Sequence, residues 1–470
     1  MTGMTHGRML LNLATLALLT LFVSLMIFGV LLLRKGRRLL GALLLLEALL
    51  ALVAQVLLST FPVGIGDPLI RVDFVGLLTQ AFSAFVVVGG VAALVYLAVR
   101  WFARLSPGGR QRGAAIMGLL VALPLVASAT MYGMTRWSLP ERERERDPLK
   151  REIKLAPGFA WSVYAQGTID NPTVITFGPD GKLYIADISG VLWVATDTNG
   201  DHKIDTITRW ADGFDLLVGL LWYKDELYTA SSGKIEALRD TNGDGVADQR
   251  RTVVDGLPSM VVRPHSNNSL ALGPDNRIYF GVGSTTRGEV EPNEHAAAVL
   301  SVNPNGSDLR VFARGFGNPF GVAFNKEGEL FGGDNSPLGE GDIPDEFNHI
   351  VEGEHYGYPY FYGDPPKNNG TIGALVSFPA HSVPTGVSFY SGNTFPQSYA
   401  DTAFVTLWGR GEIAHVEVAR TNGGTYLSRS STFGSGFLYP IDAITGPDGN
   451  LYVADFGTSA IYRITYSGAQ

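Results

Sequence analysis

One histidine and two short acidic loops are the parts of this chain whose residue types and spacing could do chemistry. The histidine, His265, lies in the segment VVRPHSNNSLALGPDNRIYFGVG at residues 261–283, directly after a proline and before Ser266, Asn267 and Asn268. A neutral imidazole near pH 7 can take a proton from a substrate. The small neighbours would leave His265 accessible for that role. The alternative is that the histidine ties down its loop through hydrogen bonds.

Two nine-residue loops place oxygen-bearing side chains at the same four positions. Their sequences are DTNGDHKID at 197–205 and DTNGDGVAD at 240–248, with these side chains at positions 1, 3, 5 and 9. The spacing matches the first part of the EF-hand calcium loop, in which a backbone carbonyl serves at position 7. The predicted calcium ligands are Asp197, Asn199, Asp201 and Asp205 in the first loop, and Asp240, Asn242, Asp244 and Asp248 in the second.

Both loops also depart from the EF-hand pattern. Neither has the acid at position 12, where Thr208 and Arg251 stand, and His202 replaces the turn glycine in the first loop. No clear helical pattern flanks either loop. We therefore predict calcium-clamped hairpins with a structural role. The alternative is an Asx-rich turn that holds no metal.

A repeated hairpin motif indicates the fold that positions these residues. FGPDGKLYIAD at 177–187, LGPDNRIYFGV at 272–282 and TGPDGNLYVAD at 445–455 each predict a turn that leads into a short strand. Weaker copies begin at Trp222, Phe324 and Tyr399, so six copies recur at spacings of roughly 45 to 75 residues. Such periods are typical of propeller blades. We predict an all-β six-bladed β-propeller over residues 153–470, closed around a central channel.

The N-terminal part of the chain has the composition of a membrane anchor. Four apolar segments, at about 9–33, 39–58, 74–99 and 114–134, are each long enough to cross a bilayer core of roughly 30 Å. The connecting loops at 34–38 and 100–112 are strongly basic, which favours the cytoplasmic side for both. We predict an α-helical four-span transmembrane region at 1–138 and a charged linker at 139–152. The N-terminus and the propeller would then be extracytoplasmic.

The distribution of charge excludes several classes of function. Residues 1–140 hold 11 basic and 3 acidic residues, whereas the whole chain holds 36 and 44, so residues 141–470 hold 25 and 41. An acidic domain repels phosphates, so nucleic acid is not an expected partner. Membrane lipid is an expected partner because of the predicted anchor. The chain has no cysteine, which excludes disulfides, thiolate metal sites and attached c-type haem.

Several longer motifs, in order, resemble the glucose/sorbosone dehydrogenase family, whose propellers use pyrroloquinoline quinone (PQQ). The resemblance covers about residues 155–465. It rests on the His265 segment and on ARGFGNPFGVAF at 313–324, PDEFNHIVEGEHYGYP at 344–359, PTGVSFYSGNTFP at 384–396 and YPIDAITGPDGNLYVADFGTSAIYRI at 439–464. The paired Asp loops look like those of a membrane-bound branch of the family.

The resemblance implies an activity and a role for particular residues. The activity is oxidation of a sugar or related alcohol, with hydride transfer to PQQ and electrons passing towards a membrane quinone. His265 would be the base that takes the substrate hydroxyl proton. Asn318 and Arg410 would contact the cofactor on the same rim of the channel. The carbonyls of Ser336 and Pro337 would bind the cofactor's Ca²⁺.

Three positions depart from the family pattern. Gly317 stands where the family has an arginine that reaches the cofactor, and Tyr439 and Ile441 replace two further arginines. PQQ is a tricarboxylate, and burial of its charges without cationic partners is costly. Two alternatives therefore stay open. One is a non-catalytic, calcium-stabilised propeller that binds a ligand or partner, and the other is a metal-dependent lactonase-like hydrolase.

Overall fold

The computed structural model describes residues 146–259, 266–286, 288–335, 342–363 and 370–468. Within these ranges, no helix has both the length and the apolar character needed to cross a bilayer. The predicted transmembrane region at 1–138 lies outside the described residues, and so do His265, Ser336 and Pro337.

The described residues form six antiparallel sheets, which confirms the predicted six-bladed propeller. Blade 1 consists of β3 (Pro172–Phe177), β4 (Leu183–Asp187), β5 (Val191–Thr196) and β6 (Thr206–Asp212). Blade 2 consists of β7 (Gly219–Tyr223), β8 (Glu226–Ser231), β9 (Lys234–Arg239) and β10 (Gln249–Val254). Blade 3 consists of β11 (Asn267–Leu272), β12 (Ile278–Val282), β13 (Ala298–Val302) and β14 (Arg310–Arg314).

The other three blades complete the domain. Blade 4 consists of β15 (Asn318–Phe324), β16 (Leu330–Asn335), β17 (Asp345–Ile350) and β18 (Val376–Phe378). Blade 5 consists of β19 (Pro384–Phe389), β20 (Ala403–Leu407), β21 (Glu412–Arg420) and β22 (Tyr426–Ser435). Blade 6 consists of β23 (Pro440–Thr445), β24 (Leu451–Asp455), β25 (Ala460–Tyr466) and β2 (Phe159–Gln166). The short strand β1 (Lys154–Leu155) pairs with β22. Three 3-10 helices are η1 (Pro148–Lys150), η2 (Gln397–Tyr399) and η3 (Trp408–Arg410).

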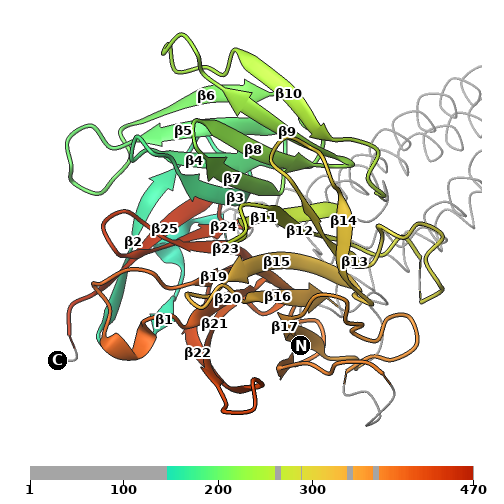
Figure 1. Cartoon of the computed structure of the whole chain (residues 1–470). Helices are drawn as coiled ribbons and strands as arrows, with labels where there is room; N and C mark the ends of the chain where they lie inside the picture. The colour runs from blue at the N-terminus through green and yellow to red at the C-terminus, as the bar shows by residue number, and fades with distance from the viewer. Residues whose placement is uncertain (1–145, 260–265, 287, 336–341, 364–369, 469–470) are drawn as a thin grey trace, which may run out of the picture. The chain divides into compact units, whose positions relative to one another are not determined.

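One inner strand from each blade lines the centre of the ring. These inner strands are β3, β7, β11, β15, β19 and β23. Each of these inner strands contacts the inner strand of the next blade, and β23 contacts β3. Figure 1 shows the six strands gathered around the middle of the domain. The outer strand of blade 6 is β2, from the N-terminal side of the domain, which pairs with β25. The two ends of the domain therefore share one sheet, which closes the ring.

The Gly-Pro-Asp motif has a packing explanation. In its three strongest copies, a tyrosine of the second strand lies against the glycine, and a Cβ added at Gly178 would come within 2.5 Å of the Tyr184 ring. The tyrosine hydroxyl also donates to the motif's aspartate, at 2.9 Å from Tyr279 to Asp275. All six hairpins between first and second strands contain one residue in the left-handed region that favours glycine. These residues are Gly181, Lys224, Asn276, Gly328, Asp401 and Gly449.

The alternation of strand directions gives the propeller two rims. Inner strands begin and second strands end at one rim, which we call the upper rim. There the Ile188 N–H donates to the Asn171 carbonyl (3.1 Å) and the Ser284 N–H donates to the Gly317 carbonyl (2.8 Å). The hairpins between third and fourth strands lie at the opposite, lower rim. The two Asp loops are hairpins of this kind, between β5 and β6 and between β9 and β10.

Candidate functional site

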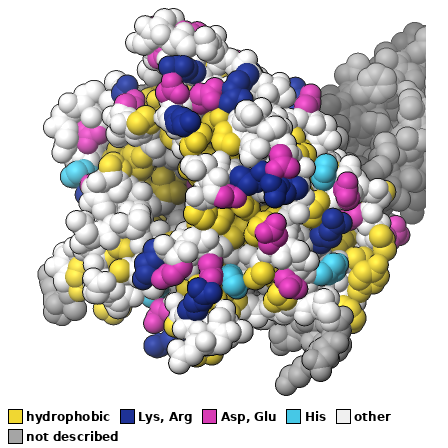
Figure 2. All heavy atoms as spheres, in the orientation of Figure 1, with side chains coloured by type: hydrophobic (Ala, Val, Ile, Leu, Met, Phe, Trp, Pro, Cys, Tyr) yellow, Lys and Arg dark blue, Asp and Glu magenta, His cyan; other side chains and the backbone are white. Residues whose placement is uncertain are grey.

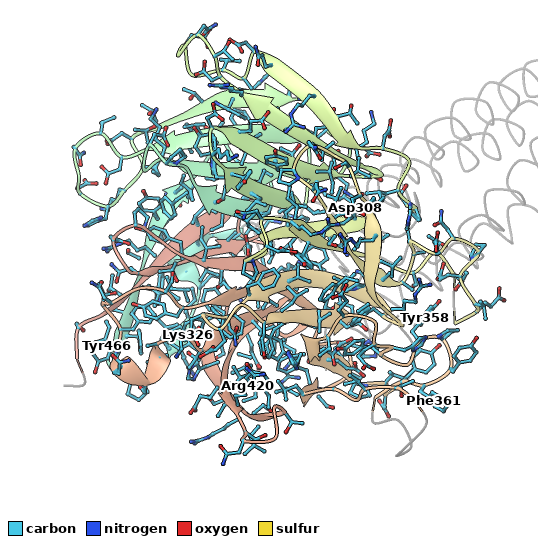
Figure 3. All side chains as sticks on the ribbon, in the orientation of Figure 1. Asp308, Lys326, Tyr358, Phe361, Arg420 and Tyr466 are labelled. Carbon is cyan, nitrogen blue, oxygen red and sulfur yellow. The ribbon has the colours of Figure 1, made fainter. Side chains whose placement is uncertain are left out.

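A pocket opens on the upper rim at blade 4. Its enclosed space is about 20 Å³, far below the roughly 300–1,000 Å³ of small-molecule sites, so a sugar would lie across its open side and contact only part of the lining. Its lining combines two carboxylates with aromatic rings: Asp334, Glu346, Tyr356, Tyr358, Phe361 and Tyr362. Figure 3 shows Tyr358 and Phe361 on the same side of the domain, in the loop that follows β17.

Strand register brings the two carboxylates together. Asp334, near the end of β16, pairs directly with Glu346, near the start of β17. Opposite residues of an antiparallel pair have Cβ atoms about 5 Å apart on the same face of the sheet. Both side chains are buried. Glu346 also accepts a hydrogen bond from the side-chain amide of Asn348 (3.1 Å).

Asp334 holds the start of the inner strand of its blade. Its carboxylate accepts the backbone N–H groups of Gly317 (2.9 Å) and Asn318 (2.7 Å). Burial raises the pKa of Asp334 well above its usual value, and the nearby charge of Glu346 raises it further, against the effect of the two N–H donors. Asp455 makes the equivalent contacts in blade 6, with the N–H groups of Leu438 and Tyr439. Part of the role of Asp334 is therefore structural.

The tyrosines of the pocket direct their hydroxyls to other partners. The Tyr356 hydroxyl donates to the His349 carbonyl (2.5 Å), and the Tyr358 hydroxyl donates to Glu291 (3.2 Å). Tyr356 also stacks on Phe316 with ring centroids 4.5 Å apart. The two rings are thus fixed in place, and because they are only 5% and 3% exposed they present little surface to the pocket. Phe361 and Tyr362 are partly exposed.

The three residues after His265 form a tie between blades. Ser266, Asn267 and Asn268 are buried. The side chain of Asn267 accepts the Gly233 N–H (2.8 Å) and donates to the Lys234 carbonyl (2.7 Å), both in blade 2. His265 itself lies outside the described residues, and its role as a base stays a prediction.

Asn318 and Arg410, the predicted cofactor contacts, both lie at the upper rim, at the start of β15 and after β20. Each is engaged with a protein partner. The side-chain oxygen of Asn318 accepts a hydrogen bond from Asn268 (2.9 Å). The Arg410 guanidinium forms two hydrogen bonds with the carboxylate of Glu412, at 3.1 and 3.2 Å.

The positions that depart from the family pattern are occupied by apolar groups. Tyr439 stacks on Trp408 with ring centroids 4.5 Å apart, and Ile441 is buried. Gly317 contributes only its backbone, through the hydrogen bond to Asp334. These positions therefore offer no side-chain cation to an anionic ligand.

The two Asp loops adopt the same hydrogen-bonded conformation. The first aspartate of each loop, Asp197 or Asp240, accepts N–H groups of residues three and five further on, at 2.7 and 2.9 Å in both loops. The last, Asp205 or Asp248, accepts the N–H and the hydroxyl of the threonine at position 2. Hydrogen bonds from Thr198 lower the pKa of Asp205. Carboxylates held in their charged form are suited to a cation.

Each loop also binds the preceding blade. Ile204 N–H donates to the Tyr164 carbonyl of β2 (2.9 Å), and Ala247 N–H donates to the Trp210 carbonyl of β6 (2.8 Å). Among the described residues, no group of three or more His, Asp or Glu side chains is close enough to hold a metal ion. Each loop contains three aspartates and one asparagine, but their side chains are not gathered into such a group, so calcium binding stays a prediction. His202 has φ 64°, in the region that favours glycine.

The pocket was not predicted from the sequence. Asp334 and Glu346 are separated by a turn, and only strand pairing shows that they are opposite. The sequence contained one indication that Asp334 has a defined place in its blade. The repeat copies that begin at Phe177, Phe324 and Thr445 all end in aspartate.

Solved structures with the same six-bladed fold include a domain of a sugar dehydrogenase. The PQQ domain of pyranose dehydrogenase from Coprinopsis cinerea, in its holo form, aligns with 68% of this chain and 98% of its own, with a TM-score of 0.58 and 17% identity. This similarity establishes a shared fold.

The family is shown by sequence. Residues 147–464 match the domain of unknown function DUF7133, and the chain belongs to that family. An uncharacterized protein of Borreliella burgdorferi is 28% identical over 352 residues, covering 67% of this chain and 91% of its own. Quinoprotein glucose dehydrogenase B of Acinetobacter calcoaceticus is 24% identical over 251 residues, covering 42% of this chain and about half (51%) of its own.

Proposed function

We propose that this protein is a membrane-anchored, extracytoplasmic propeller that binds a sugar or related alcohol at the upper rim. The observation that carries the proposal is the pocket at blade 4, in which Asp334 and Glu346 lie beside four aromatic rings. The names of its relatives, a glucose dehydrogenase and a pyranose dehydrogenase, point to the same class of ligand.

The chemistry of the pocket suits a polyol. Glu346 lines the pocket, and its carboxylate is an acceptor that suits sugar hydroxyls. Hydrogen bonds to a charged group contribute about 1.5–3 kcal/mol each. The partly exposed rings of Phe361 and Tyr362 supply apolar surface for the C–H groups of a pyranose, and most small-molecule sites combine such surface with a few polar groups.

The described residues do not fit PQQ. The carboxylates of this cofactor require cations, whereas the described lining of the pocket includes two acids and no Lys, Arg or His. Arg410 is paired with Glu412. Hydride transfer to PQQ is a second candidate function, because the names of the relatives favour it. No catalytic step is assigned to the described residues. Ser336 and Pro337, the predicted ligands of the cofactor's Ca²⁺, lie outside the described residues.

We further propose that the Asp loops bind Ca²⁺ and stabilise the contacts between blades. Each loop brings charged carboxylates into a hairpin that hydrogen-bonds to the preceding blade. A cation would offset the repulsion among these carboxylates. Its role is structural, because the loops lie on the rim opposite the pocket.

Isothermal titration of the full-length protein in detergent with glucose and related pyranoses tests the ligand. Glu346→Gln should weaken binding by about 10- to 100-fold, the equivalent of one hydrogen bond to a charged group. The control is Glu352→Gln, which makes the same change of charge at an exposed position. Equal affinities for the two variants would contradict the assignment of the pocket.

The same preparation distinguishes the second candidate. PQQ and Ca²⁺ are added, and dye-linked oxidation of the bound sugar is followed. Binding without turnover supports a binding propeller. Sugar-dependent turnover would identify a dehydrogenase and show that cationic partners for PQQ are supplied beyond the described residues.

A further inference from the structure

The pocket at blade 4 encloses room for one small group. Its enclosed space is about 20 Å³, and a single water needs roughly 10–15 Å³. A sugar ring is far larger, so only a substituent of the ring can enter. Phe361 and Tyr362 line the same pocket and are partly exposed, so they can contact the ring outside the enclosed space. The pocket therefore suits a ligand with a small head group and a larger body.

Two acids make the enclosed space negative. Asp334 and Glu346 lie opposite each other on β16 and β17, and both line the pocket. Burial and the charge of Glu346 raise the pKa of Asp334 well above its usual value, because a second negative charge is unfavourable there. The described lining contains no Lys, Arg or His. A cation that enters beside the two carboxylates would favour their charged forms.

The loop after β12, which contacts the pocket, is acidic as well. Tyr358 lines the pocket and donates its hydroxyl to Glu291 of this loop (3.2 Å). Glu289 and Glu294 of the same loop are exposed. Arg314, at the end of β14, is exposed and is not among the described residues that line the pocket. The acids around the pocket therefore favour the approach of a cationic ligand and oppose that of an anionic one.

A buried amide beside the acids has an acceptor without a donor. Asn348 is 1% exposed and lies two residues after Glu346, on the same face of β17. Its amide nitrogen donates to the Glu346 carboxylate (3.1 Å), whereas its Oδ1 atom has no hydrogen-bond partner among the described residues. Buried acceptors in proteins are nearly always paired. The carboxylates and this oxygen together favour a ligand group that carries several donors.

An ammonium group fits these acceptors better than a calcium ion does. It has one positive charge and three N–H donors, and the acceptors are two carboxylates and one amide oxygen. Ca²⁺ takes about six to eight oxygen ligands. Within the part of the chain that the structure describes, no group of three or more acids or histidines is close enough to hold a metal ion. An ammonium group is also close in size to the water that the enclosed space could hold.

We propose that the pocket binds an amino sugar, with its ammonium group beside Asp334 and Glu346 and its ring against Phe361 and Tyr362. The proposal rests on the sugar site of the proposed function and narrows the ligand of that site to one chemical class. A neutral sugar would lack the charge-assisted hydrogen bonds that an ammonium group makes with carboxylates. A uronate or a sugar phosphate would bring a like charge to the acids.

Isothermal titration of the full-length protein in detergent at pH 6.5 tests the proposal with glucosamine, glucose, N-acetylglucosamine and glucuronate. Glucosamine should bind about 10- to 100-fold more tightly than glucose, which is the effect of one hydrogen bond between charged groups. N-acetylglucosamine keeps the nitrogen without the charge, so it should not bind more tightly than glucose. Glucuronate should show no binding. Ethanolamine, an ammonium compound without a ring, controls for general attraction to an acidic domain and should bind more weakly than glucosamine.

Glu346→Gln should remove the preference for glucosamine over glucose, while Glu352→Gln, the same change at an exposed position, should keep it. Melting temperatures establish that both variants are folded, and the comparison of sugars on the natural protein does not depend on either variant. Equal affinities of the natural protein for glucosamine and glucose would overturn the amino-sugar proposal and leave the sugar site standing. Binding of none of the sugars would overturn both.

A titration with Ca²⁺ separates an ammonium site from a metal site. The natural protein and Glu346→Gln should bind Ca²⁺ equally, and Ca²⁺ should not displace glucosamine. Binding of Ca²⁺ that is lost in Glu346→Gln and that prevents glucosamine from binding would identify a metal site in the pocket and overturn the proposal.

Discussion

Asp442 provides a sharp test of how the ring is closed. The partly buried carboxylate of Asp442, on β23, accepts the Ile175 N–H of blade 1 (3.0 Å) and the N–H of Ala443 (2.9 Å). Burial raises the pKa of Asp442 from 3.8 to about 6, against the effect of these two donors. Blade 6 is thus joined to blade 1 by a carboxylate that binds a proton more tightly in the folded state.

The raised pKa of Asp442 determines how the stability of the fold changes with pH. Because the folded pKa is the higher one, the contribution of Asp442 to stability is fully present below pH 4 and is lost as the pH rises through 6. The difference between 3.8 and about 6 corresponds to about 3 kcal/mol of folding free energy. Asp442→Asn cannot ionise, so the stability gap between natural protein and variant should narrow by about this amount between pH 4 and pH 7.

The assay is thermal unfolding of the full-length protein in detergent, followed by tryptophan fluorescence from pH 4 to pH 7. The natural protein should exceed Asp442→Asn in melting temperature most clearly at pH 4, because the amide cannot accept both N–H groups. Asp255→Asn, at an exposed position, is the control and should follow the natural profile. Parallel profiles for the natural protein and Asp442→Asn would refute the reasoning.

Four further predictions concern the Asp loops, the ties between blades and His265. Removal of Ca²⁺ by a chelator should lower the melting temperature, since a ligand of the folded state stabilises it by mass action, and Asp244→Ala should reduce this response. His202→Gly should raise stability by about 1 kcal/mol in urea unfolding, because φ 64° is unfavourable for histidine; an unchanged midpoint would contradict this. Asn268→Ala should cost roughly 2–4 kcal/mol in the same assay, because it leaves the buried acceptors of Asn318 and Pro319 without a donor. If the protein proves to be a dehydrogenase, His265→Ala should lower kcat by about 10²–10⁴-fold without loss of folding, and a loss below tenfold would count against a base.

Charged side chains of both signs are mixed on one face of the domain. Figure 2 shows basic and acidic side chains interspersed over the visible face of the domain. A nucleic-acid site would be expected to collect basic residues into a continuous patch.

The number of blades could be predicted because it is encoded locally. Each copy of the hairpin motif contains its own turn residue, and the strongest copies contain the glycine and tyrosine that pack together within a dozen residues. All six predicted copies became the second strands of blades, from β4 to β24. The outer strand of blade 6 was not visible in the sequence, because β2 and β25 are about 300 residues apart.

The pocket depended on long-range contacts and could not be predicted in the same way. A spacing in the sequence cannot show that Asp334 lies opposite Glu346, or that Glu412 engages Arg410. These outcomes are set by strand register and by burial, which leave some polar groups paired with each other and others facing solvent. The sequence alone therefore determined the repeat, the propeller and the acidic loops, since each depends on neighbouring residues. The tertiary structure decided which carboxylates and rings share the upper rim, because closure of the ring brings together segments that have no local relation.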